Sequence, residues 1–295
     1  MPRYLAPDPG FARVATALLA IFLCAAASLT PDPSLQCSDC RDWNEPQAPF
    51  RIFGNTWYVG TAGLSSILID TGSGLILLDG GLPQSAPLID ANLRGLGFSI
   101  DEVRYIALSH AHFDHAGGIA ALQRASGARV LSSTAGAEAL RRGALLPTDP
   151  QFGFGPERTD FPAVANVTAI EDGETILLGD VTLRGIHTPG HTPGGMSWTW
   201  RSCEGGRCLD MVYADSLSPV SAPGFRFSGG AAKAIRTSAD RIAGLDCDIM
   251  LAPHPFLFDL QARAERGEEA FIDDQACRRY AEDSLARLER RLRTE

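Results

Sequence analysis

The chain has 295 residues, of which 45% are hydrophobic and 21% are charged, and its formal net charge is −9 at pH 7. This length and apolar content suffice for one large core or two small ones. The acidic balance, with no basic stripe along the chain, argues against nucleic acid as a partner.

The first 27 residues resemble a bacterial export signal. Arg3 and Arg13 are positive, and an apolar run over residues 14–27 closes in small residues. The run is too short for a secure transmembrane helix and ends like a cleavage site. We therefore predict a signal peptide over 1–27, and a periplasmic or secreted protein that makes no membrane contact after cleavage.

The remaining chain divides into a leader over 28–42, predicted to be poorly ordered, and one domain over 43–295. Apolar and alternating runs predict strands over 51–59, 64–70, 74–79, 103–108, 128–132, 175–178, 181–187, 196–200, 209–214 and 248–252. Amphipathic stretches predict helices over 84–96, 116–126, 134–142, 229–244 and 273–292. Strands followed by helices occur twice, which predicts an α/β fold of two similar halves packed sheet to sheet. We expect this domain to be a monomer.

The last predicted helix is rich in arginine. Arg278, Arg279 and the arginines from Arg287 to Arg293 alternate with Glu and Leu. This pattern predicts the solvated face of a helix rather than a binding patch.

Five of the six histidines gather in three short motifs. The first, H-A-H-F-D-H over 110–115, directly follows the strand predicted over 103–108. His191 follows a Pro-Gly turn, and His254 lies between two prolines. Such a compact group of His and Asp is hard to explain by packing and is typical of a zinc site.

Spacing predicts how these side chains divide between two metal ions. Residues two apart in an extended chain point the same way, so His110 and His112 can bind one ion. His191 is the candidate for the third nitrogen of that ion. Neutral imidazoles in a three-ligand open site suit Zn²⁺ and leave room for water.

The second ion would be held where the chain turns toward a helix. Asp114 and His115 lie just beyond the first pair, and His254 completes a second set of three. Two zinc ions about 3.5–4 Å apart can bridge one hydroxide and hold a substrate oxygen. The sixth histidine, His187, could support a ligand from outside or be merely structural, and the structural role is favoured.

The pattern H-x-H-x-D-H, followed by H-T-P-G-H and a late histidine, resembles the signature of the metallo-β-lactamase superfamily. Further motifs resemble the third subclass of class B β-lactamases: F-R-I-F-G-N-T-W-Y-V-G over 50–60, L-L-D-G-G over 77–81, Y-A-D-S-L-S over 213–218 and A-P-H-P over 252–255. The resemblance runs from about Trp43 to the C-terminus. It implies an αββα four-layer sandwich with His-His-His and Asp-His-His metal sites in a cleft at one edge of the sheets.

The resemblance also implies a function. A secreted dizinc β-lactamase would hydrolyse the amide bond of β-lactam antibiotics, carbapenems included, through a metal-bound hydroxide, and would confer antibiotic resistance. Asp114 would be catalytic, since it binds the second zinc and orients the hydroxide. Ser216 would contact the metal-bound water and the small-molecule substrate.

Two other functions stay open. In lactonases and thioesterases of the same fold, an aspartate at the position of Asp215 bridges both metals. An iron oxidoreductase could use the same pocket, although the sequence carries no cofactor motif. Metal content separates the oxidoreductase from the hydrolases, and substrate turnover separates the hydrolases from one another.

Further residues are expected to bind substrate. Ser216, Ser218 and Ser221 can donate hydrogen bonds to the carboxylate of a β-lactam. A Pro-, Gly- and Phe-rich loop over 147–156 would overhang the site in this family, so its Phe152 or Phe154 can contact substrate. An ordinary packed loop is the alternative.

Asp79 follows a very apolar strand. A buried carboxylate needs a partner, and holding a ligand histidine from outside would provide one. The alternative is an aspartate that caps a turn.

Six cysteines follow residue 27, an even number that suits an oxidising compartment. Cys203 and Cys208 flank a tight turn and can staple a hairpin. Cys247 and Cys277 can tie the last helix to the sheet, a bridge common in the subclass that the chain resembles. The C-x-x-C pair at 37 and 40 suggests a local disulfide or part of a disordered leader, with a redox or zinc role as the alternative.

Overall fold

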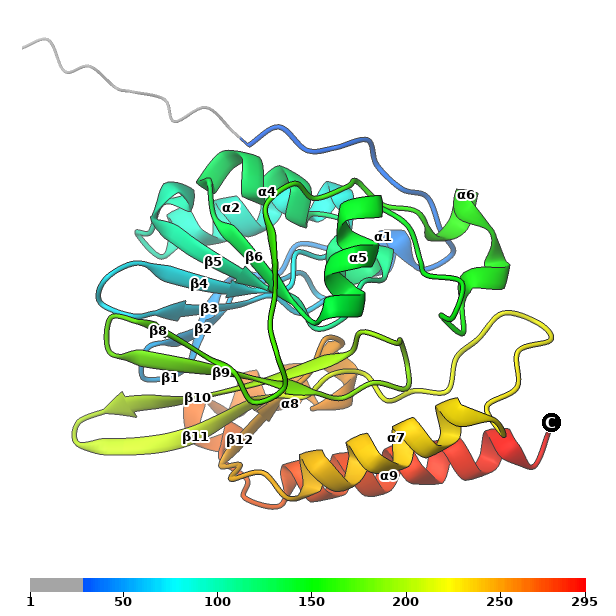
Figure 1. Cartoon of the computed structure of the whole chain (residues 1–295). Helices are drawn as coiled ribbons and strands as arrows, with labels where there is room; N and C mark the ends of the chain where they lie inside the picture. The colour runs from blue at the N-terminus through cyan, green and yellow to red at the C-terminus, as the bar shows by residue number, and fades with distance from the viewer. Residues whose placement is uncertain (1–28) are drawn as a thin grey trace, which may run out of the picture.

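A computed structural model describes residues 29–295, so the predicted signal peptide lies outside the described residues. Two β-sheets stack face to face, and helices cover the outer face of each (Figure 1). The helices over the first sheet are α2 (Ala86–Gly95), α4 (Ile119–Ser126) and α5 (Thr134–Arg142). Those over the second are α7 (Gly230–Ala243) and α9 (Ala276–Leu292). The predicted αββα sandwich is confirmed.

The first sheet has seven strands in sequential order. They are β1 (Phe50–Phe53), β2 (Thr56–Tyr58), β3 (Ile67–Asp70), β4 (Leu75–Leu78), β5 (Val103–Ala107), β6 (Arg129–Ser132) and β7 (Val167–Ala169). Strands β1 to β4 pair antiparallel, and β4 to β7 pair parallel. The single strand predicted over 51–59 is wrong, because the chain reverses at Gly54, whose φ of 53° glycine adopts without strain. The short strand β7 is not predicted.

The second sheet has five strands in the order β12-β11-β10-β9-β8. They are β8 (Thr175–Leu178), β9 (Val181–His187), β10 (Met196–Glu204), β11 (Arg207–Tyr213) and β12 (Ile249–Leu251). The hairpin of β10 and β11 is longer than predicted and turns at Gly205 and Gly206, which both have positive φ. Cys203 and Cys208 are paired opposite each other in this hairpin and form a disulfide.

Shorter helices connect these elements. They are α1 (Cys40–Trp43), α3 (Phe113–Ala116), α6 (Pro156–Thr159) and α8 (Leu260–Arg266), with 3-10 turns at Pro83–Ser85, Ile100–Glu102, Phe152–Phe154, Pro255–Leu257 and Glu268–Phe271. Helices α1, α6 and α8 are not predicted, because one or two turns are too few to reveal a helical period. Over residues 29–295, none of the helices has the length and apolarity that crossing a bilayer needs.

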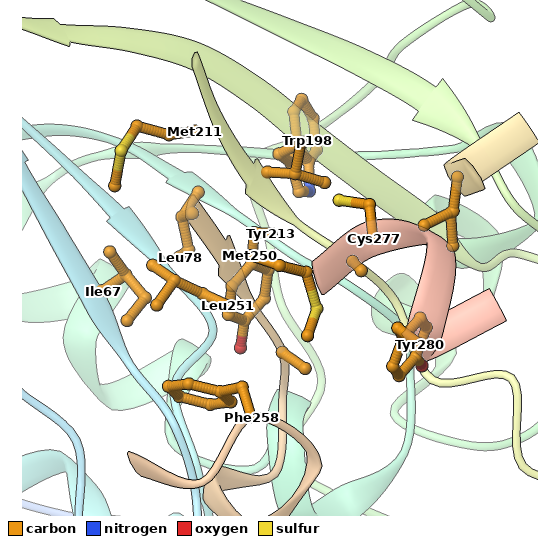
Figure 2. Close-up of a cluster of buried hydrophobic side chains, with 14 of the residues drawn as sticks. Ile67, Leu78, Trp198, Met211, Tyr213, Met250, Leu251, Phe258, Cys277 and Tyr280 are labelled. Carbon is orange, nitrogen blue, oxygen red and sulfur yellow. The ribbon is translucent and has the colours of Figure 1, made fainter. Parts of the chain in front are cut away.

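The space between the two sheets is filled by large apolar side chains (Figure 2). Trp198 and Tyr213 from the second sheet are fully buried against Ile67 and Leu78 from the first. Burial of this apolar area is the main force that holds the sheets together. The ring nitrogen of Trp198 also donates a 3.0 Å hydrogen bond to the carbonyl of Leu108, which joins the second sheet to the chain just before the histidine motif.

The described part of the predicted leader, residues 29–42, contacts the domain. Gln84 exchanges two hydrogen bonds with the backbone of Leu35, of 3.1 and 2.9 Å. Cys40 is buried beside Leu64 and Leu82 and forms a disulfide with Cys37. Apolar contacts and a local cross-link therefore hold this segment against the domain.

The third disulfide joins Cys247, just before β12, to Cys277 in the first turn of α9. The sequence predicts both this pair and the hairpin pair. Cys277 and Tyr280 turn from α9 toward the core of the second sheet (Figure 2), so the last helix is fixed covalently and by packing.

Candidate functional site

Several strands end at the same edge of the sandwich, and each is followed by a candidate residue. Strands β4 and β5 run parallel, so Asp79 and the motif from His110 follow them at one edge. In the second sheet β9, β11 and β12 share a direction, and His191, Asp215 and His254 follow their ends. The backbone N–H of Met196 donates to the carbonyl of Ser109 at 2.8 Å, which brings the two edges together.

The structure brings all six predicted ligands together in the two predicted sets. His110, His112 and His191 offer ligand atoms that all lie within 4.8 Å of one another, and so do Asp114, His115 and His254. Each set can hold one metal ion. The two sets are neighbours, because the ring centroids of His110 and His115 lie 4.4 Å apart.

Each imidazole of the first set is held from outside through one nitrogen. His110 Nδ1 lies 2.8 Å from Asp215 Oδ1, and His191 Nδ1 lies 2.8 Å from the carbonyl oxygen of Ser218. His112 Nε2 lies 3.2 Å from both carboxylate oxygens of Asp149. The other nitrogen of each ring is left for a metal, and such outer contacts fix the tautomer and orientation of ligand histidines.

The second set surrounds Asp114. One of its oxygens, Oδ2, lies 3.2 Å from His115 Nε2 and 3.5 Å from His254 Nε2. Both ring nitrogens of His115 are buried without a hydrogen-bond partner among the described residues. A buried polar atom without a partner is unfavourable, and coordination of a metal by Nε2 would satisfy it. His254 itself packs between the rings of Trp43 and Phe256, at centroid distances of 5.5 and 5.3 Å.

Burial prepares these side chains for a cation. It lowers the pKa of His110 well below its ordinary value, the pKa of His191 to about 3 and that of His254 to about 4. Burial by itself would raise the pKa of Asp114, but the neighbouring His115 outweighs it, and the pKa of this carboxyl falls far below its usual range. At neutral pH His110, His191 and His254 are therefore neutral and Asp114 is ionised, which are protonation states that bind Zn²⁺. Burial lowers the pKa of His115, but the neighbouring Asp114 and Asp79 outweigh it and raise this pKa above its ordinary value.

Asp79 anchors the loop that carries the first ligands. Its carboxylate accepts hydrogen bonds from the backbone N–H and the hydroxyl of Ser109 at 2.7 and 2.6 Å, and from the Tyr213 hydroxyl at 2.8 Å. It also lies 3.6 Å from His115 Nδ1. Asp79 adopts a φ of 58°, which few residues other than glycine do, so the surrounding contacts fix an otherwise unfavourable backbone. These contacts match the predicted outer role and exceed what a turn cap needs.

Asp215 belongs to neither set of three. Its Oδ1 holds His110, and its backbone N–H donates to Ser197 at 2.9 Å. A Cβ on Gly195 would meet Asp215 Oδ2 at 2.2 Å, so only glycine fits there. Tight packing therefore keeps this carboxylate on the outer side of His110.

A pocket of about 660 Å³ opens over both ligand sets and is lined by His112, Asp114, His191 and His254. Three groups of lining residues are called walls here. The leader wall is residues 36–39, and the second wall is Gln151, Phe154, Arg158 and Thr159. The serine wall consists of Ser216, Leu217, Ser218 and Val220 with Tyr280 and Arg287 from α9, and Trp43, Phe113, Phe256 and Leu257 complete the lining. The ligand sets thus lie exposed to a space that accommodates a small molecule.

The predicted substrate residues divide between this pocket and its surroundings. Ser216, Ser218 and Phe154 line the pocket. Ser221 does not, because its hydroxyl accepts a 2.8 Å hydrogen bond from Arg291 on α9. Phe152 is 47% exposed and outside the pocket lining.

Sequence reasoning misses several residues around the site. Asp149 lies in the loop singled out for its phenylalanines, and no local signal marks it as the partner of His112. Residues 36–39 were expected in a poorly ordered leader. Arg287 was predicted to be solvated, but it lines the pocket, so that prediction is wrong for this arginine. His187 is structural, as expected, with Nε2 2.9 Å from the carbonyl of Ile170.

Comparisons with known proteins agree with this site. The family model of the metallo-beta-lactamase superfamily matches residues 59–254. The Rm3 metallo-beta-lactamase is 47% identical, with a TM-score of 0.85, over 88% of this chain and 98% of that one. MEM-A1, described as a subclass B3 metallo-beta-lactamase from a soil metagenome library, is 49% identical, with a TM-score of 0.82, over 86% and 98% of the two chains.

One relative is named as a thioesterase and not as a β-lactamase. The human (Homo sapiens) acyl-coenzyme A thioesterase MBLAC2 is 32% identical over 177 residues, a match that spans 55% of this chain and 60% of that protein. The fold, the two ligand sets and these similarities lead to one conclusion: the chain belongs to the metallo-β-lactamase superfamily and is similar over most of its length to enzymes of subclass B3.

Proposed function

We propose that this protein is an exported dizinc β-lactamase that hydrolyses the amide bond of β-lactam antibiotics, carbapenems included, and so confers resistance. One observation carries the proposal. Ser216 and Ser218 line the pocket beside both ligand sets, while Asp215 is held on the outer side of His110. This arrangement supports substrate binding by the serines over bridging of two metals by Asp215.

The donor sets fit two zinc ions. Three neutral imidazoles would hold one ion, and one carboxylate with two imidazoles would hold the other. When bound, such ions supply Lewis acidity toward a carbonyl oxygen and lower the pKa of water enough for attack at neutral pH.

The protein's own residues position the reactants. Asp114 is the one carboxylate in the two sets and is ionised, so it can accept a hydrogen bond from the attacking water and orient it. The hydroxyls of Ser216 and Ser218 can donate to the substrate carboxylate. Because the carbonyl of Ser218 contacts His191 Nδ1 at 2.8 Å, the loop with these serines is joined directly to the first ligand set.

A thioester hydrolase is the second candidate, and the similarity to the human acyl-coenzyme A thioesterase favours it. The chain spans 60% of that relative, so the activity of the whole relative does not transfer directly. Hydrolysis of a lactone is the related possibility.

Turnover separates these candidates. The zinc-loaded protein without residues 1–27 would be assayed with a chromogenic cephalosporin, a carbapenem, an acyl-coenzyme A thioester and a lactone. We expect chelator-sensitive hydrolysis of both β-lactams, and two zinc ions per chain by mass spectrometry. Hydrolysis of the thioester or lactone alone, with two zinc ions bound, would replace the proposal. A protein that holds iron instead would point to an oxidoreductase.

Export is part of the proposal. Three disulfides within residues 37–277 support a protein that folds in an oxidising compartment. We expect the full-length chain, expressed in a Gram-negative host, to appear as a monomer in the periplasmic fraction without its first residues, about 27 in number. Retention of an intact N-terminus in the cytoplasm would contradict export.

A further inference from the structure

One face of the last helix runs along the serine loop. Tyr280, Ser284, Arg287 and Arg291 follow a spacing of four, three and four residues, which places them on one side of α9. At one end, the Tyr280 hydroxyl donates to the carbonyl of Asp215 at 2.6 Å and accepts from the backbone N–H of Leu217 at 3.2 Å.

At the other end, the guanidinium of Arg291 donates to the Ser221 hydroxyl at 2.8 Å. The loop therefore passes along α9 with Leu217 beside Tyr280 and Ser221 beside Arg291. Arg287 lies between Tyr280 and Arg291 on this side of the helix and lines the same pocket as Ser218 and Val220. Its guanidinium is the cation of α9 that this geometry brings to the serine wall of the pocket.

Arg287 has unused binding capacity. One of its terminal nitrogens donates to the Ser284 hydroxyl at 3.0 Å, and the other makes no hydrogen bond within the described chain. Its Nε is also without a partner but is buried, so the terminal nitrogens are the groups that a ligand could reach. Residues 29–295 also offer it no ion pair, whereas Arg279 pairs with Asp273 and Arg291 with Glu295. An arginine that turns into a pocket without an acidic partner is suited to an anionic ligand.

The charged groups around Arg287 also favour an anionic ligand. Burial and Asp215 raise the pKa of the neighbouring Tyr280, and the positive charge of Arg287 opposes that rise. Of the acids that line the pocket, Asp114 belongs to a ligand set and Asp39 lies on the leader wall. Arg158, the other lining cation, sits over the ring of Phe154 at 5.2 Å on another wall.

We propose that Arg287 binds the carboxylate of the substrate, together with the hydroxyls of Ser216 and Ser218. The inference rests on the proposed function and adds to it a requirement for an anionic group on the substrate. A guanidinium offers parallel N–H donors that match a carboxylate, and the serine hydroxyls offer neutral donors alongside. Since this carboxylate does not react, Arg287 would bind ground state and transition state equally and act mainly on KM.

The test measures the kinetics of two proteins, wild type and R287M, on two substrates that differ only in the charge of the carboxylate. Arg287→Met keeps much of the side chain and removes its charge, and the methyl ester of the chromogenic cephalosporin removes the charge of the substrate. We expect R287M to raise KM for the free acid by about 10- to 100-fold with kcat within about threefold, as loss of a charge-assisted hydrogen bond would. For the ester we expect less than about a threefold change, because no anion remains to be bound.

Three controls complete the experiment. Arg287→Lys should raise KM less than R287M does, since lysine keeps the positive charge but lacks the parallel N–H donors of the guanidinium. Arg290→Met, on the exposed face of the same helix, should match the wild type. Thermal unfolding and zinc content of R287M should equal those of the wild type, which separates substrate binding from a structural defect.

Each other outcome is decisive. Equal losses with the acid and the ester, or unchanged kinetics with the acid, would overturn the role of Arg287 while leaving the β-lactamase proposal intact. A KM effect from Arg158→Met in place of R287M would assign the anion to the wall that contains Phe154. If the wild type hydrolyses neither cephalosporin, the proposed function fails and this inference fails with it.

Discussion

The two ligand sets and the walls of the pocket are built in different ways. Each histidine of the first set has one ring nitrogen next to an oxygen of a neighbouring residue, which orients the ring. Asp79, which anchors the loop before His110, accepts three hydrogen bonds by itself. The walls come from separate segments of the leader, of residues 151–159, of residues 216–220 and of α9, and some of their side chains, such as Val220 at 49%, are exposed. We therefore expect substitutions of the metal ligands and their hydrogen-bond partners to alter metal binding and turnover. Substitutions of the wall residues should alter KM.

The largest effect is expected at the centre of the ligand sets. Asp114→Ala removes the one carboxylate of the second set and leaves His115 and His254 as its remaining ligands. Zinc content should fall from two to about one per chain, and kcat/KM by roughly a thousandfold or more, since each metal contributes several kcal/mol to transition-state stabilisation. Mass spectrometry and steady-state kinetics check this, and unchanged turnover with two zinc ions would contradict the role of Asp114.

A smaller effect is expected one layer outward. Asp149→Asn keeps the shape of the side chain but weakens its hold on His112 Nε2, now 3.2 Å away. Zinc affinity should fall about 10- to 100-fold, as is usual for loss of an outer carboxylate, and chelator competition measures it. Asp160→Asn, at an exposed aspartate eleven positions along the chain, is the matched control. An affinity loss shared by both variants would show that Asp149 has no special role.

The ligand residues could be predicted because their signal is local. Four of the six lie within residues 110–115, and strand geometry relates their directions. Two of their outer partners could not, because Asp149 is 37 positions from His112 and Asp215 is 105 positions from His110. Only the packing of the two sheets decides which distant carboxylate reaches a given ring.

The same reason explains what sequence reasoning misses in the fold. Long periodic segments such as 134–142 and 181–187 are found with their observed bounds. The strand β7 and the helix α8 have three and seven residues, too few for a period to appear. For Arg287 the helical pattern is correct, but it cannot show that a loop from another part of the chain covers one turn of the polar face.

The walls should respond more weakly, and two neighbouring phenylalanines provide a matched pair. Phe154→Ala removes an aromatic ring that lines the pocket, and KM should rise about 3- to 10-fold through lost apolar contact. Phe152→Ala removes a ring that is 47% exposed and outside the pocket, so it should leave KM unchanged. Steady-state kinetics on a cephalosporin compares them, and a larger effect at Phe152 would contradict the wall described here.

The smallest effect on activity is expected at the tip of the long hairpin. Replacing Cys203 and Cys208 together by alanine removes a cross-link between residues that are already paired in register. The free energy of unfolding should fall by at most about 2 kcal/mol, while kcat/KM and zinc content stay as in the wild type. Denaturant unfolding and kinetics measure both, and loss of activity without loss of stability would link the tip to the site.

The disulfide between Cys247 and Cys277 also bears on limited proteolysis. It closes a ring of chain that contains His254 and ends at the helix carrying Arg287, and Gly267 in this ring is exposed. A protease that cuts at Gly267 would leave two fragments joined by the disulfide, with every metal ligand in the larger one. Reduction would remove this covalent link, and the smaller fragment would then be held only by the packing of α9 against the second sheet, so the stability of the nicked protein should depend on the disulfide.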